Sequence, residues 1–220
     1  MQFFLLIQPK SDSIEDRAGG MDVMSEENCN LGPAPRCPRC NRPLGMKTWQ
    51  PPYRLEIETW GKHYGDIART GDDLIVSERF KDYFERAGLK GIETFEPVEV
   101  IKVVHRRGKP QEPIPLYFKA SVVRNSAIID QKASEYEWED ESKVCPECLF
   151  DTLKRNRRLV IKQETWNGDD SFFPRGGDGP IVSERFRSIC EEHQLLGAIF
   201  IPSDSEDAGY DSFPWEVKAK

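Results

Sequence analysis

Four of the six cysteines lie in two short pairs that are far apart in the chain. Cys37 and Cys40 flank Pro-Arg, and Cys145 and Cys148 flank Pro-Glu. A gap of two residues lets both thiolates of one turn point toward the same ion, and four thiolates satisfy the tetrahedral coordination that zinc prefers in a closed structural site. We therefore predict one structural Zn²⁺ bound by these four cysteines. Such an ion would join two segments that are 108 residues apart.

Two other interpretations of the cysteine pairs remain open. A Cys-Pro-x-Cys segment is also compatible with a redox-active dithiol, or with inert thiols. Neither pair lies in a βαβ pattern, which weakens the redox interpretation. Six cysteines in 220 residues are too few for a disulfide-stapled secreted domain, and Cys29 and Cys190 lie outside any motif.

Residues typical of catalysis are sparse. The chain has three histidines, His63, His105 and His193, and it contains no nucleophile elbow, HExxH or Walker pattern. The glycine-rich segment 175–179 lacks the full phosphate-binding pattern and is better interpreted as a turn. A closed site of four thiolates also leaves no position for a substrate. The sequence therefore predicts a protein that is not an enzyme.

Charge indicates the kind of partner. The chain has 38 acidic and 31 basic residues, a net charge of -7, which opposes attraction to nucleic acid and favours a basic partner. The stretches 135–141 and 204–211 alternate carboxylates with aromatic rings, a composition suited to binding a basic protein, although a solvated loop is an equally good interpretation. The candidate contact residues are Glu135, Glu137, Trp138, Glu139, Asp140, Asp204, Glu206, Asp207 and Asp211. Phe172, Phe173 and Trp215, in predicted loops, would add to an interaction surface.

Two basic clusters, 105–109 and 154–158, give the alternative hypothesis of a zinc-ribbon protein that binds nucleic acid. No aromatic residues are interleaved with these clusters, and the whole chain is acidic. A solvated face is the better interpretation.

The sequence repeats itself at a shift of 106 residues. Between 55 and 94 the ungapped overlay gives 15 identities in 40 positions, including the segments Glu-Thr-Trp and Ile-Val-Ser-Glu-Arg-Phe. The cysteine pairs follow nearly the same shift. We interpret this as an internal repeat with halves 1–130 and 131–220, which form two units or one compact domain.

The spacing of apolar residues predicts the elements of each half. Phe80, Tyr83, Phe84 and Ala87 recur at helical spacing, as do the residues 106 positions later, and Ser77 and Ser183 occupy N-cap positions. Strands are predicted at 55–60, 96–104, 116–123, 159–166 and 197–201, and the first residues also form a strand. Loops are predicted at 10–36, 131–143, 167–180 and 202–214. The predicted fold is α+β, with antiparallel strands followed by an amphipathic helix in each half.

Together these motifs resemble the double-CXXCG motif family of bacterial immunity proteins. The resemblance rests on the MQFF start, the CPRC and CPEC pairs, and the IVSERF segment followed by a helix. It implies that Cys37, Cys40, Cys145 and Cys148 are the paired cysteines and that no residue is catalytic. One departure is the residue after each pair, which is Asn41 or Leu149 in place of glycine. A left-handed turn there is tolerated by Asn and is sterically costly for Leu.

The resemblance implies a cytoplasmic immunity protein that binds and neutralises a toxin, with a nuclease as the candidate toxin. Acidic residues would then occlude the basic active-site surface of the toxin. The segment MQFFLLIQPK is too short for a signal peptide, and no stretch approaches the roughly 20 apolar residues that cross a bilayer. We therefore expect no membrane partner.

Overall fold

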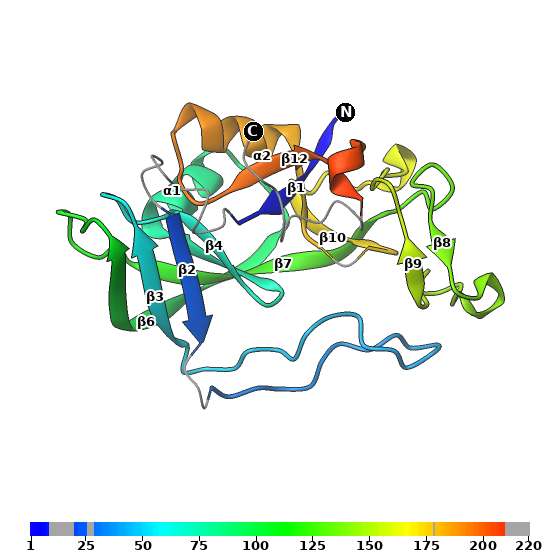
Figure 1. The fold of residues 1–220 in the computed structure, drawn as a ribbon, viewed down its shortest axis with the longest axis horizontal. Coiled ribbons are helices and arrows are strands. Elements are labelled where there is room, and N and C mark those ends of the chain that lie inside the picture. Colours follow the sequence, from blue (N-terminus) through cyan, green and yellow to red (C-terminus); the bar gives the residue numbers. More distant parts are fainter. Residues whose placement is uncertain (9–19, 26–28, 178, 210–220) are drawn as a thin grey trace.

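The computed structural model describes residues 1–8, 20–25, 29–177 and 179–209. The chain is α+β, as predicted, and the described residues contain two α-helices, α1 (Glu78–Arg86) and α2 (Glu184–Glu192) (Figure 1). Neither helix is long and apolar enough to cross a membrane. Short 3-10 turns cover Glu141–Lys143, Gln163–Thr165 and Glu206–Ala208.

Ten strands form one sheet that contains both halves of the sequence. Its main path runs β12-β1-β11-β10-β7-β6-β3-β2, while β4 pairs with β5 and β5 also pairs with β7. The strands are β1 (Phe3–Ile7), β2 (Gly20–Ser25), β3 (Arg54–Trp60), β4 (Ile67–Thr70), β5 (Asp73–Ser77), β6 (Ile92–Arg107), β7 (Tyr117–Ile128), β10 (Ser171–Arg175), β11 (Ile181–Ser183) and β12 (Ile199–Pro202). A separate two-stranded sheet pairs β8 (Glu137–Trp138) with β9 (Leu153–Arg155).

Strand β7 connects the two halves of the sheet. Its first residues pair with β5 and β6, and its later residues pair in parallel with β10. Strand β3 is also parallel to β6, so the prediction of purely antiparallel strands is wrong. The N-terminal strand β1 lies between β11 and β12 of the other half.

Burial on both faces explains the apolar run Phe-Phe-Leu-Leu in β1. Successive side chains of a strand point to opposite faces. Phe4 and Leu6 pack in the core beneath the two helices, whereas Phe3 and Leu5 pack in a second core with Ile129. A strand covered on both sides has no solvent-facing position for a polar residue.

Local chemistry fixes both helices where the sequence predicts them. The hydroxyl of Ser77 accepts the amide of Phe80 at 3.1 Å, and that of Ser183 accepts the amide of Phe186 at 3.2 Å. Phe80 and Phe186 are buried and their ring centroids are 5.6 Å apart, so the two helices share one core. Cys190 lies in this core, and burial raises its pKa well above the ordinary thiol value.

Two buried aspartates join the repeated segments in a reciprocal way. Asp66, just before β4, accepts the hydroxyl of Ser77 at 2.6 Å and the amide of Leu196 at 2.9 Å, and it pairs with Arg79. Arg79 in turn donates to the carbonyl of His193, at the end of α2.

The second aspartate makes the equivalent set of contacts in the other repeated segment. Asp170 accepts the hydroxyl of Ser183 at 2.7 Å and the amide of Lys90 at 2.9 Å, and it pairs with Arg185. Arg185 donates to the carbonyl of Ala87, at the end of α1. Each Ser-Glu-Arg segment therefore begins its own helix and caps the end of the other helix.

Four segments differ from the prediction, and one of them is the predicted loop 131–143, which contains β8. The predicted strand 159–166 consists of an isolated bridge at Ile161 and a 3-10 turn at Gln163–Thr165, so the two Glu-Thr-Trp segments adopt different structures. The predicted loop 10–36 contains β2, and the predicted loop 167–180 contains β10. Both strands are short and lie among turn-forming residues, and their pairing depends on strands elsewhere in the chain.

Candidate metal centre

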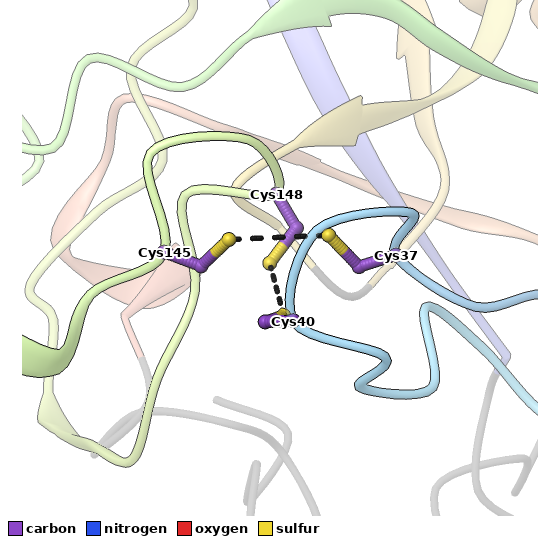
Figure 2. Close-up of side chains that lie close together, drawn as sticks. All are labelled: Cys37, Cys40, Cys145 and Cys148. Carbon is purple, nitrogen blue, oxygen red and sulfur yellow. Dashed lines mark hydrogen bonds between the residues drawn. The ribbon is translucent and has the colours of Figure 1, made fainter.

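The four paired cysteines lie together, although they come from distant parts of the chain. All four Sγ atoms are within 4.8 Å of one another. Sγ of Cys37 is 3.9 Å from that of Cys145, and Sγ of Cys40 is 3.7 Å from that of Cys148, so the shortest contacts join one pair to the other (Figure 2).

These distances match a tetrahedral metal site. Four sulfur atoms at a Zn–S distance of about 2.3 Å are separated from one another by about 3.8 Å, whereas the sulfurs of a disulfide are about 2 Å apart. All six cysteines are free thiols, and Cys37, Cys145 and Cys148 are buried. The arrangement is compatible with four donors around one ion.

The two cysteine turns have the same backbone conformation. The amide of Asn41 donates to the carbonyl of Cys37 at 2.9 Å, and the amide of Leu149 donates to the carbonyl of Cys145 at 2.8 Å. Asn41 has φ 58° and Leu149 has φ 59°. Both positions therefore adopt the left-handed conformation that the glycine of the double-CXXCG pattern would allow, Leu149 despite its steric cost.

Backbone amides stabilise a thiolate in each turn. The amide of Cys40 donates to the sulfur of Cys37 and lowers the pKa of that thiol. The equivalent bond from the amide of Cys148 lowers the pKa of Cys145 to about 6 and so favours the thiolate form of Cys145. Burial raises the pKa of Cys148 to about 12. A bound cation would favour the thiolate form of every member of the cluster.

The left-handed conformation of Leu149 should lower the free energy of unfolding, because this conformation is unfavourable for a residue with a bulky side chain. We expect Leu149→Asn to raise the free energy of unfolding by about 1 kcal/mol, measured by urea denaturation of the metal-free protein. Asn41→Leu introduces the same strain in the first turn and should lower the free energy of unfolding by a similar amount. Equal free energies of unfolding for both variants and the parent would show that the left-handed conformation of Leu149 causes no strain.

A long arm carries the first cysteine turn. Residues 29–50 leave the sheet and return to it below the strands (Figure 1). Within the arm, the amide of Gly32 donates to the carbonyl of Thr48 at 2.8 Å, and the amide of Leu44 donates to that of Pro35 at 2.8 Å. Arg124 of β7 donates to the carbonyl of Leu44 at 2.8 Å and so attaches the arm to the sheet.

Groups next to the sulfurs also join the two turns. Arg42, which follows the first pair, forms an ion pair with Asp151, which follows the second. The guanidinium of Arg42 also lies over the ring of Phe150, and Phe150 packs against the cysteines. The arm is therefore held to the second turn by an ion pair and an apolar contact besides the cysteine cluster.

Comparison with known proteins assigns the chain to a family. A family model described as "Immunity protein family (Imm11)" matches residues 6–204. The chain belongs to this immunity protein family. The expectation of an immunity protein family is confirmed, although the description of the matching family says nothing of paired cysteines. No curated protein matches the chain.

The acidic stretch of this immunity-family chain lies beside its basic cluster. Glu137 pairs with Arg155 across the β8–β9 sheet, and Glu135 lies 2.7 Å from Arg158 and 3.4 Å from Arg157. These ion pairs hold the pKa of Glu137 below its ordinary value. The acidic stretch 135–141, predicted to bind a basic protein, and the basic cluster 154–158, considered for nucleic acid, therefore neutralise each other to a large extent.

The other candidate contact residues have varied surroundings. Asp140 pairs with Lys143 at 3.1 Å and caps the turn Glu141–Lys143. Trp138 is half-buried against Tyr136 and Phe150. Exposed side chains remain at Glu139, Asp204, Glu206 and Asp207, while Asp211 lies outside the described residues.

The aromatic residues assigned to loops do not support an interaction surface. Phe172 and Phe173 belong to β10 and are buried in the two cores on either side of the sheet. The prediction of a role in partner binding is wrong for these two residues, because β10 is an interior strand between β7 and β11. Trp215 lies outside the described residues.

The histidines have ordinary surface surroundings. Nδ1 of His63 is 3.1 Å from the carboxylate of Glu112, and Nδ1 of His105 is 3.0 Å from the hydroxyl of Thr59. His193 stacks on the ring of Tyr83. In the basic cluster 105–109, Arg106 pairs with Glu58.

Sequence reasoning missed Asp66 and Asp170. Asp66 precedes its serine partner by 11 residues and Asp170 precedes its partner by 13. An ungapped overlay therefore places Asp66 opposite Phe172. Allowing a two-residue insertion between strand and helix would have aligned the two aspartates.

Proposed function

We propose that this chain is an immunity protein that binds a cognate protein toxin and blocks its active-site surface, with a structural zinc ion in the cysteine cluster. The observation that carries the proposal is the match of the immunity protein family over residues 6–204.

The proposed site of action is the cytoplasm, where reduced thiols are maintained. We also infer that the halves 1–130 and 131–220 arose by duplication, which accounts for the reciprocal contacts of Asp66 and Asp170.

The proposed zinc has a structural role. Cys37 and Cys40 would bind it from the arm, and Cys145 and Cys148 from the second turn, so that the ion fixes the arm against the body. Zinc with four thiolate ligands supplies rigidity, because no coordination position stays open for a substrate.

The proposed toxin-facing surface is the acidic edge formed by residues 135–141 and 204–208. The two stretches flank the segment 156–159, since the amide of Arg157 donates to the carbonyl of Ser134 at 3.2 Å and the amide of Leu159 donates to that of Ser203 at 2.6 Å. Because Glu135, Glu137 and Asp140 are paired with basic residues, the carboxylates that would imitate the phosphates of a nuclease substrate and accelerate association with a basic toxin are the exposed Glu139, Asp204, Glu206 and Asp207. The alternative function of nucleic-acid binding is weakened, because the basic cluster 154–158 is paired with Glu135 and Glu137.

Co-expression tests the proposed function. The toxin encoded beside this gene should arrest growth when expressed alone, and the two proteins together should permit growth and co-purify. Failure of the pair both to co-purify and to relieve the arrest would contradict the proposal.

Charge reversal tests the acidic edge. The triple variant Asp204→Lys, Glu206→Lys and Asp207→Lys should slow association with the toxin about tenfold at low salt and remove most of its salt dependence, because these charges would steer the encounter. Stopped-flow measurement gives the association rate. The triple variant Glu78→Lys, Glu191→Lys and Glu192→Lys, on the two helices, makes the same change in net charge elsewhere. An equal effect of both triple variants would show that only net charge matters and would contradict the assignment of this edge.

A further inference from the structure

A cavity of about 730 Å³ lies between the arm and the sheet. The arm contributes mostly apolar residues, among them Leu31, Pro33 and Met46. The turn between β4 and β5 contributes Asp72, and the first residue of β5 is Asp73. Its size is that of a site for a small molecule or for a few residues of a peptide. The cavity lies apart from the acidic edge assigned above.

A buried tryptophan lines this cavity. Trp49 is 5% exposed, and its Nε1 has no hydrogen-bond partner within the part of the chain that the structure describes. Buried N–H groups in folded proteins are nearly always paired. The Nε1 atom is itself enclosed by protein atoms, so Trp49 contributes its ring, and not its N–H, to the wall of the cavity.

The carboxylates in the wall of the cavity carry negative charge that one lysine does not fully compensate. Lys119 lies 3.6 Å from Asp73 and 2.9 Å from Glu96, so one ammonium group serves two carboxylates. Burial raises the pKa of Asp73, which is the effect expected for an incompletely compensated carboxylate. Exposed Glu93 also lines the cavity. Arg124 adds no free charge, because it is paired with Asp72 at 2.6 Å.

Exposed apolar side chains border the same cavity. Leu31 is 53% exposed and Met46 is 61% exposed, and both belong to the arm. Methionine adapts its shape readily and is common at binding surfaces. Among the described residues that line the cavity, the exposed Lys47 of the arm is the one cation without a carboxylate partner.

We propose that this cavity binds a segment of the toxin that combines an apolar side chain with a lysine or arginine. The apolar side chain would pack on Leu31 and Met46, and the cation would pair with Asp73 and Glu93. This inference rests on the proposed function and adds a second contact region to the acidic edge.

The cysteine cluster would control this site through the arm. The arm forms one wall of the cavity, and its far end is fixed where Cys37 and Cys40 meet Cys145 and Cys148. Nearer the cavity, the arm is fixed by a hydrogen bond of 2.6 Å from the amide of Met46 to the carboxylate of Asp72. Removal of the metal should therefore weaken toxin binding as well as stability.

Two matched pairs of surface variants test the proposal, with the purified toxin encoded beside the gene as the probe. Met46→Asp and Glu93→Lys should each weaken toxin binding at least about tenfold by calorimetry, because they change central contacts of the interface. Leu116→Asp and Glu192→Lys are the controls and should bind within about twofold of the parent, since Leu116 is 63% exposed and Glu192 is exposed, both away from the cavity. In the parent protein, the indole N–H resonance of Trp49, assigned with Trp49→Phe, should shift on addition of toxin.

The outcomes separate this inference from the proposed function. If the parent binds the toxin but Met46→Asp and Glu93→Lys bind as tightly as their controls, and the Trp49 resonance does not move, the cavity assignment is wrong and the immunity function stands. If the parent binds no toxin, the proposed function is wrong and the cavity assignment fails with it.

Discussion

Replacing Cys145 with serine should reduce bound zinc from about one ion per chain to a small fraction and lower the free energy of unfolding by at least about 4 kcal/mol. The reason is that a structural metal binds the folded chain far better than the unfolded one, so its binding energy is folding energy. Cys145 is buried, and its sulfur lies 3.9 Å from that of Cys37, on the other side of the proposed ion. Elemental analysis and urea denaturation in zinc-containing buffer measure the two effects.

Cys29→Ser is the matched control for this variant. Cys29 is half-buried and lies outside the cluster, so its replacement should leave zinc content unchanged and stability within about 0.5 kcal/mol of the parent. Chelation of the parent should reproduce the loss seen with Cys145→Ser. Full stability of the chelated parent would show that the four cysteines are not a metal site.

Replacing Asp66 with alanine should lower the free energy of unfolding by about 3 kcal/mol, because it leaves the buried hydroxyl of Ser77 and the amide of Leu196 without their acceptor. Asp170→Ala removes the equivalent acceptor in the other half and should cost about the same. The matched control is Asp82→Ala, which removes an exposed ion pair with Arg86 on α1 and should cost less than about 0.5 kcal/mol. Chemical denaturation gives all three values.

A loss of less than about 1 kcal/mol for both Asp66→Ala and Asp170→Ala would contradict the view that these aspartates join the halves. A large loss for one of them alone would show that the reciprocal contacts are unequal in energy. The expected result is two large and similar losses.

Features that depend on nearby residues could be predicted from the sequence. The helices after Ser77 and Ser183 follow from capping groups and apolar spacing within one or two turns. The left-handed turn at Asn41 is compatible with the glycine that the double-CXXCG pattern has there, whereas the same turn at Leu149 goes against the steric preference of that residue. The meeting of the two cysteine pairs was also predictable, because each pair alone supplies too few ligands for zinc.

Features that depend on distant partners could not be predicted. Strand β10 was assigned to a loop because its pairing with β7 and β11 is set by residues elsewhere in the chain. The acidic stretch looked available for a partner because its pairing with the cluster 154–158 depends on the meeting of β8 and β9. The cavity beside Trp49 exists only when the arm is folded against the sheet.

The most direct test of the account is native mass spectrometry of the protein co-expressed with the toxin encoded beside it. The account predicts a complex that contains both chains and one zinc ion for each copy of this chain. A metal-free chain that runs separately from the toxin would contradict both the metal centre and the immunity function.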